Sequence, residues 1–230
     1  MTHETGRVAL AEELLLLAYD DETGKATGSR IGLDLGMAAA VMVDLALAGR
    51  VVLDGAMLTV IDRTPVGESI ADDVLVRLAA ETPQSANAWV QRLRHGLRDK
   101  VLADLVARGI VTDVDETALE YIHVHRYPMA DQAVELEVRA RLTAALTSDD
   151  TPDERTAALA TLVAAARMEP ALLVPPAEAQ AAHRRLGEIA ERAGFSGSLG
   201  MENSVVRPSV ALVIDSLYRA IDTALGRAAA

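Results

Sequence analysis

The sequence lacks cysteine and has few aromatic residues. Because none of the 230 residues is cysteine, disulfide bonds, thiolate metal sites and cysteine nucleophiles are excluded. Aromatic residues make up 3% of the chain, whereas hydrophobic residues as a whole make up 50%. The core must therefore consist mostly of Leu, Val, Ala, Ile and Met. This composition favours the packing of helix on helix, and we expect a mainly α-helical fold.

Positive charge is also scarce. The chain has 22 Lys and Arg residues against 34 Asp and Glu residues, which gives a formal net charge of −12 at pH 7. A negative particle is not broadly attracted to nucleic acid or to an anionic bilayer. Any site for an anion must therefore be a local cluster of basic residues.

No hydrophobic run reaches the length of a membrane span. The apolar part of Ile31–Arg50 is shorter than the roughly 20 residues that a span needs, and it contains Asp34 and Asp44. At the amino terminus, Leu14–Ala18 is too short for the apolar region of a signal peptide. We therefore expect a cytoplasmic protein.

The stretch Ile31–Arg50 predicts the central element of the fold. Its apolar side chains point to almost every side of a helix, which is typical of a helix buried all round. The helix should end at Gly49-Arg50, since glycine is a common helix stop. We predict a helical bundle in which the other elements cover this helix.

Apolar residues at helical spacing predict the surrounding helices. They cover Val8–Tyr19, Ile70–Ala80, Ala86–Arg108 with a break near Gly96, Asp131–Leu146, Arg155–Ala166, Glu178–Ala193 and Ser209–Gly226. The Ala- and Leu-rich helix Arg155–Ala166, capped by Asp153 or Thr151, should be buried. The polar helix Glu178–Ala193 should lie on the outside.

Two or more short β-hairpins are expected, and the sequence places two of them between the helices. Val51–Leu53 and Ala56–Val60 flank Asp54-Gly55, a strong hairpin signal. A second hairpin should pair Ile110–Thr112 with a strand within Ala118–His125, with its turn around Asp113–Glu116. We expect one domain over residues 1–230, with residues 1–7 flexible.

The search for catalytic signatures gives no sign of an enzyme. No Gly-x-Ser-x-Gly elbow is present, and Gly24–Gly28 lacks the order of a phosphate-binding P-loop. His123 and His125 share one face of a predicted strand, but no third metal ligand is suggested nearby. We therefore expect no catalytic residues, no metal and no cofactor.

Some carboxylates fall on otherwise apolar predicted helices: Asp34, Asp44, Asp215 and Asp222. Two interpretations stay open. They are buried carboxylates with raised pKa values, or they are helix caps and ion pairs with partners such as Arg219 or Arg50.

One local cluster of basic residues stands out in the acidic chain. It comprises Arg92, Arg94, His95, Arg98 and Lys100. Converging guanidinium groups suit phosphate, and Arg94 and Arg98 lie four residues apart on one helical face. The alternative is a solvated helix face whose charges pair with nearby Asp and Glu, and composition alone favours this alternative.

Several motifs occur in an order that resembles the Golgi phosphoprotein 3 (GPP34) family. They are the run Leu10–Leu17, the segment Asp44–Val51, Pro65-x-Gly67, Trp89-Val90-x-x-Leu93 and Leu105-Val106-x-x-Gly109-Ile110-Val111. The resemblance spans almost the whole chain, and we expect a bacterial member of the family.

The resemblance implies a non-catalytic peripheral membrane protein. Eukaryotic members bind phosphatidylinositol 4-phosphate in a basic pocket and insert a hydrophobic hairpin into the bilayer. For this chain it implies an anionic phospholipid head group or a protein as the partner, and a peripheral position on the inner face of the plasma membrane. We expect a monomer or a weak oligomer that does not bind nucleic acid.

The family's head-group pocket carries over only in part. Ser29 takes the place of a tryptophan and Ala38 that of an arginine, whereas His95 and Arg98 match two further arginines. Only Arg98 is retained outright, with Arg94 and Arg30 as substitutes. The resemblance therefore implies a degraded head-group site of Ser29, Arg30, Arg94, His95 and Arg98.

The membrane-contacting hairpin is altered as well. Leu119, Tyr121 and Ile122 are apolar and are expected to contact the membrane. Glu120 and His123 make deep insertion expensive. Two other functions stay open: a protein-interaction scaffold without lipid binding, and a winged-helix-like nucleic-acid binder, against which the net charge argues.

Overall fold

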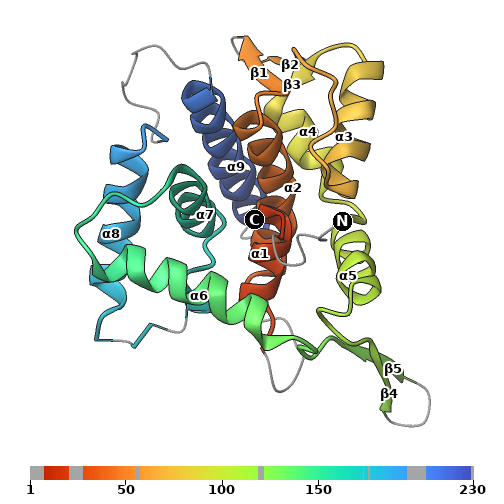
Figure 1. Ribbon diagram of the computed structural model, residues 1–230, viewed down its shortest axis with the longest axis vertical. Coiled ribbons are helices and arrows are strands. Elements are labelled where there is room, and N and C mark those ends of the chain that lie inside the picture. The colour runs from red at the N-terminus through yellow and green to blue at the C-terminus, as the bar shows by residue number, and fades with distance from the viewer. Residues whose placement is uncertain are drawn as a thin grey trace, which may run out of the picture.

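The computed structural model describes residues 8–20, 28–54, 57–118, 122–172, 174–175, 177–195 and 206–228. Its α-helices are α1 (Leu10–Ala18), α2 (Arg30–Leu47), α3 (Ser69–Ala80), α4 (Ala86–Leu93), α5 (Leu97–Ala107), α6 (Gln132–Thr147), α7 (Glu154–Ala165), α8 (Ala179–Arg192) and α9 (Val206–Ala228). The predicted mainly α-helical fold is confirmed (Figure 1). Residues 1–7, predicted to be flexible, lie outside the described residues.

Helix α2 is the central helix that the sequence predicts. Ser29 caps it, since its hydroxyl accepts a hydrogen bond from the Gly32 amide at 3.1 Å, and its side chains are buried along almost its whole length. It packs against α1, α3, α4, α5, α7 and α9. Among the described residues, no helix is both long and apolar enough to cross a membrane.

Glycines allow α2 to approach the end of α7 closely. A Cβ atom on Gly32 would lie 2.2 Å from the carbonyl oxygen of Ala166, and one on Gly36 would lie 3.0 Å from the Ala166 Cβ. Neither glycine has a positive φ. These positions therefore need glycine because of packing and not because of backbone conformation.

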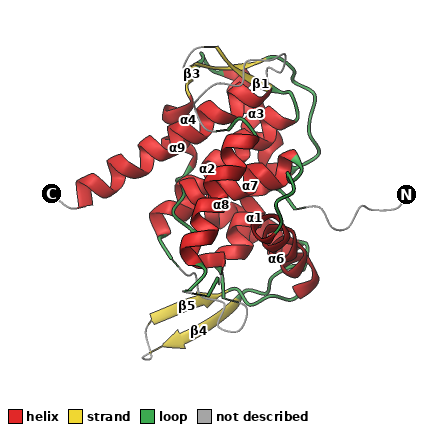
Figure 2. Ribbon diagram, turned by 90° about the vertical axis from the view of Figure 1, so that its left-hand side faces the viewer, coloured by secondary structure: helices red, strands yellow, loops and turns green. Residues whose placement is uncertain are grey.

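The first hairpin is confirmed. Strand β1 (Val51–Asp54) pairs antiparallel with β2 (Met57–Val60), with Val51 opposite Val60. The structure adds a short strand that the sequence did not predict, β3 (Gln84–Ser85), on the other edge of β2. Helix α2 leads directly into this sheet, which lies at one end of the molecule (Figures 1 and 2).

The predicted second hairpin was placed wrongly. It consists of β4 (Val114–Ala118) and β5 (Ile122–Arg126), so most of the predicted turn Asp113–Glu116 lies in a strand. Ile110 and Val111 are instead buried after α5. Their apolar side chains belong to the core, and the hairpin is built from the more polar residues that follow. It projects at the end of the molecule opposite the β1–β3 sheet (Figure 2).

The predicted helix boundaries and burial are otherwise largely confirmed. Gly96, with φ of 75°, separates α4 from α5, and Asp153 caps α7 by accepting a hydrogen bond from the Thr156 amide at 3.0 Å. Helix α7 is buried, whereas α8 buries one narrow face. A 3-10 helix, η1 (Glu169–Leu172), follows α7.

Candidate functional site

The structure brings together three of the residues predicted for the head-group site. Ser29 and Arg30 begin α2, and Arg98 lies in the first turn of α5. The Arg98 Nη2 donates a hydrogen bond to the Arg30 carbonyl oxygen at 3.2 Å, although the two residues are 68 positions apart in the chain. We call this set, together with Arg94 and His95, the arginine site.

Arg94 and His95 lie in the short connection between α4 and α5. The Arg94 Nε is 3.4 Å from the His95 Nε2. His95 and Arg30 are exposed, whereas Arg94 is half-buried. Arg30 at the start of α2 and Arg94 at the end of α4 therefore add two further cationic side chains, while Ser29 acts as the cap of α2.

The guanidinium of Arg98 forms an ion pair with an acidic residue, Asp34. The Asp34 Oδ1 lies 2.6 Å from the Arg98 Nη2, and the side chains of Arg98 and Asp34 are 11% and 25% exposed. The Arg98 Nε is buried and makes no hydrogen bond with the described residues. Arg98 thus has an ion-pair partner of its own within the fold.

Two tyrosines that the sequence did not point to connect the arginine site with the second hairpin. Burial raises the pKa of Tyr19, and the positive charges of Arg98 and Arg30 oppose this rise. The Tyr19 ring meets the Tyr127 ring edge to face at 6.1 Å. Since Tyr127 follows β5 directly, the arginine site lies at the hairpin end of the molecule.

The hairpin is described only in part. Leu119 and Tyr121, two of the predicted membrane contacts, lie outside the described residues, and Ile122 begins β5. The His125 Nδ1 donates a hydrogen bond of 2.9 Å to the Asp113 Oδ1, and this bond holds the pKa of His125 above its usual value. Among the described residues, no cluster of three or more potential ligands could hold a metal ion.

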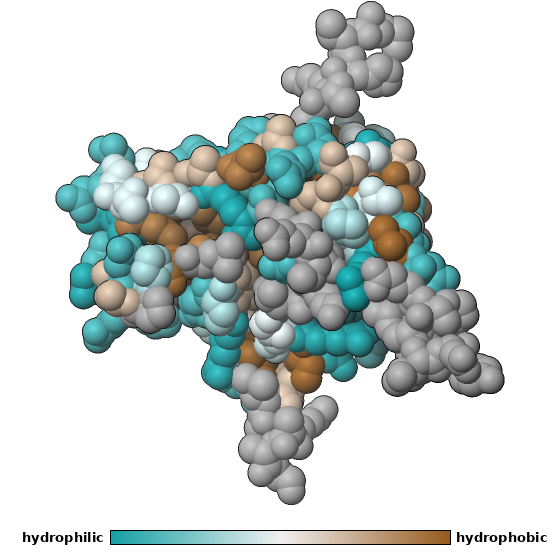
Figure 3. Space-filling model, turned by 90° about the horizontal axis from the view of Figure 1, so that it is seen from below, coloured by the Kyte–Doolittle hydropathy of each residue, from teal (hydrophilic) through white to brown (hydrophobic). Residues whose placement is uncertain are grey.

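The surface at the hairpin end is mixed. Seen from below, it shows hydrophilic side chains between separate hydrophobic ones (Figure 3). Ile31, beside Arg30, is 37% exposed.

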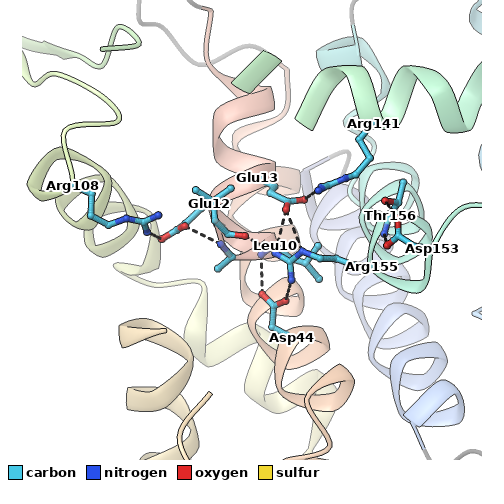
Figure 4. Close-up of polar contacts among 11 residues, drawn as sticks. Leu10, Glu12, Glu13, Asp44, Arg108, Arg141, Asp153, Arg155 and Thr156 are labelled. Carbon is cyan, nitrogen blue, oxygen red and sulfur yellow. Dashed lines mark hydrogen bonds and ion pairs between the residues drawn. The ribbon is translucent and has the colours of Figure 1, made fainter. Parts of the chain in front are cut away.

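A second group of charged residues surrounds the start of α1 (Figure 4). The Asp44 Oδ2 accepts a hydrogen bond from the Leu10 amide at 2.8 Å, and its Oδ1 lies 2.8 Å from the Arg155 Nη1. Arg155 also donates to the Val8 carbonyl oxygen at 2.5 Å and to Glu13 at 3.2 Å. We call this group the buried polar network.

Two further arginines extend the network. Arg141 pairs with Glu13 at 2.5 Å, and Arg108 pairs with Glu12 at 2.7 Å. Burial raises the pKa of Glu12, opposed by the Ala9 amide and by Arg108. Burial also raises the pKa of Asp44 to about 7, opposed mainly by Arg155. The network fixes the start of α1 against α2, α5, α6 and α7.

The predicted ion-pair partners of the four aspartates are confirmed only in part. Asp215 pairs with Arg219 as suggested, whereas Arg50 pairs with Asp62 and not with one of the four carboxylates. Asp44, Asp34 and Asp222 pair with arginines on other elements. The only signal for these pairs in the sequence was a charge on an otherwise apolar helix, which does not name the partner.

Residues 10–217 are similar to a known protein family. The model of the family described as Golgi phosphoprotein 3 (GPP34) matches residues 10–217. No protein with a curated description matches the chain. The matched range runs from the first residue of α1 into α9 and includes both charged groups described above. The chain belongs to the Golgi phosphoprotein 3 (GPP34) family.

Proposed function

We propose that this chain is a non-catalytic module that binds the phosphate of an anionic phospholipid head group at the arginine site. The hairpin end of the molecule then faces the membrane, and the protein is peripheral. Phosphatidylinositol 4-phosphate and other phosphate-bearing head groups are the ligands in this proposal.

The observation that carries the proposal is the convergence of Arg98 with the start of α2. Guanidinium groups hold phosphate by charge-assisted hydrogen bonds, and the amino end of a helix favours an anion. Arg30 lies close to Arg98 in the structure, and Arg94 lies four residues before it in the chain. Both can add positive charge to the site.

In this proposal the hairpin end of the molecule makes only a shallow contact with the membrane. Ala38 is fully buried in α2, so the position that the resemblance gives to an arginine supplies no polar group. The hairpin carries Asp113 and Asp115 as well as His125, and charged residues are expensive inside a bilayer. Binding should therefore depend on a few local charges on a particle that is negative as a whole.

Cosedimentation with vesicles tests the proposal. Vesicles of phosphatidylcholine with a minor fraction of phosphatidylinositol 4-phosphate should pellet the wild type, and pure phosphatidylcholine should not. The double change Arg94→Gln and Arg98→Gln should weaken binding by about tenfold or more, since each charged hydrogen bond is worth about 1.5 kcal/mol or more.

The matched control is Arg63→Gln. Arg63 lies in the connection after β2, at the opposite end of the molecule, and it is exposed. This variant loses a positive charge far from the site, so its binding should equal that of the wild type. Equal loss in all variants would point to overall charge, and an unchanged double variant would remove the arginine site from the proposal.

A further inference from the structure

The ion pair between Asp34 and Arg98 bears on how the arginine site works, if the proposed function holds. Asp34 lies on α2 one turn after Arg30, and its carboxylate takes the same Nη2 that donates to the Arg30 carbonyl oxygen. The pair is largely shielded from solvent. A carboxylate therefore already stands where a phosphate oxygen would bind this guanidinium.

We propose that Asp34 is an internal competitor, which occupies Arg98 until a phosphate group displaces it. The inference rests on the proposed function and adds a regulation and a ligand preference to it. Because Asp34 is attached to the same fold, its effective concentration at Arg98 is high. A ligand gains access only if it interacts with the site more strongly than one carboxylate does.

This competition has a consequence for the class of ligand. A phosphomonoester carries a charge near −2 at neutral pH, whereas a phosphodiester carries −1 and is matched by the single charge of Asp34. The site should therefore favour head groups with a terminal phosphomonoester. Removing the carboxylate should raise affinity for both classes and reduce the difference between them.

The variant Asp34→Asn tests this inference. Its side chain has nearly the same shape, and Asp34 is already partly exposed, so the fold should be retained, as a melting curve will show. The matched control is Asp99→Asn. Asp99 is exposed and adjacent to Arg98 in the chain, so its replacement changes the net charge equally in the same region.

The measurement compares vesicles that contain phosphatidic acid or phosphatidylinositol 4-phosphate, each of which carries a phosphomonoester, with vesicles that contain phosphatidylglycerol, whose phosphate is a diester only. Soluble inorganic phosphate, titrated by calorimetry, separates the phosphate group itself from the lipid surface. Relative to Asp99→Asn, we expect Asp34→Asn to bind phosphatidylglycerol vesicles at least about threefold more tightly. Adding Arg98→Gln should abolish this gain.

The outcomes separate the two proposals. If the wild type binds and Asp34→Asn binds no more tightly than Asp99→Asn, the competitor is refuted and the proposed function stands. If neither the wild type nor Asp34→Asn binds any vesicle or phosphate, both proposals fail. Binding by Asp34→Asn without binding by the wild type supports the competitor most strongly.

Discussion

Asp44 is a buried residue whose ionisation affects the stability of the protein. It is buried between the Leu10 amide and the Arg155 guanidinium. Burial disfavours its charged form more than these two partners favour it, so its pKa rises from 3.8 to about 7. The native state therefore binds a proton at Asp44 between about pH 4 and 7 that the unfolded chain releases.

Because of this pKa shift, we expect the loss in the free energy of unfolding caused by Asp44→Asn to depend on pH. Because the native state holds the extra proton, the contribution of Asp44 to the free energy of unfolding is fully present below about pH 4. It falls as pH rises toward 7, by roughly 4 kcal/mol at most. Urea unfolding of the wild type and Asp44→Asn at pH 5 and pH 7.5 should show a larger cost of the substitution at pH 5. An equal or larger cost at pH 7.5 would mean that Asp44 is ionised at both pH values and that its pKa is not raised.

Arg155 is the common partner in the buried polar network. Its replacement by alanine leaves the buried side chains of Asp44 and Glu13 without this charge and hydrogen-bond partner. The free energy of unfolding should fall by about 3–5 kcal/mol, measured by urea unfolding at neutral pH. Arg184→Ala is the control, because the Arg184 side chain is 70% exposed, and it should change stability by less than about 1 kcal/mol. A loss of that small size in Arg155→Ala would refute a stabilising role for the network.

The sequence indicates which charged residues are unusual but not what they contact. Asp34 and Asp44 stand out on a helix that is apolar on all sides. Their partners cannot be read from the sequence, since Arg155 is 111 residues from Asp44. The same limit applies to the arginine site, where Arg98 was predicted and the roles of Asp34 and Tyr19 were not.

At the scale of elements, the contact between α2 and the end of α7 gives a sharp test of packing. A Cβ on Gly32 would collide with the backbone oxygen of Ala166, and backbone cannot yield as a flexible side chain does. Gly32→Ala should destabilise the protein by about 1–3 kcal/mol, measured by thermal or urea unfolding.

Gly187 is the matched control for this substitution. It lies within α8, and a Cβ there would meet nothing within 4 Å. Gly187→Ala should therefore stabilise the protein by about 0.4–1 kcal/mol, because alanine has the higher helix propensity. Destabilisation of equal size in both variants would show that the close approach of α2 to α7 is not the cause.

Helices and their ends could be predicted from the sequence where neighbouring residues determine them. The periodicity of α2, the glycine between α4 and α5 and the cap of α7 are all local signals, and each was read correctly. The position of the second hairpin was predicted wrongly because Ile110 and Val111 are apolar enough to form a strand. In the structure these two side chains are buried in the core directly after α5. That outcome depends on tertiary packing, which short patterns do not contain.

At the scale of the whole molecule, the two sheets define opposite ends. Helix α2 runs from the arginine site to the β1–β3 sheet, and the β4–β5 hairpin projects beyond the other end (Figure 2). The account therefore predicts one orientation on a membrane, with Ile31 close to the lipid and Met57 far from it. These residues are matched probes, since both are hydrophobic and are 37% and 41% exposed.

The most direct test of this orientation uses a single introduced cysteine, which the absence of native cysteine makes unique. Ile31→Cys and Met57→Cys would each carry a dye whose emission shifts to the blue in an apolar environment. With vesicles that contain phosphatidylinositol 4-phosphate, the dye at position 31 should shift and the dye at position 57 should not. A shift at position 57 alone, or at neither position while the protein pellets with the vesicles, would contradict binding through the arginine site.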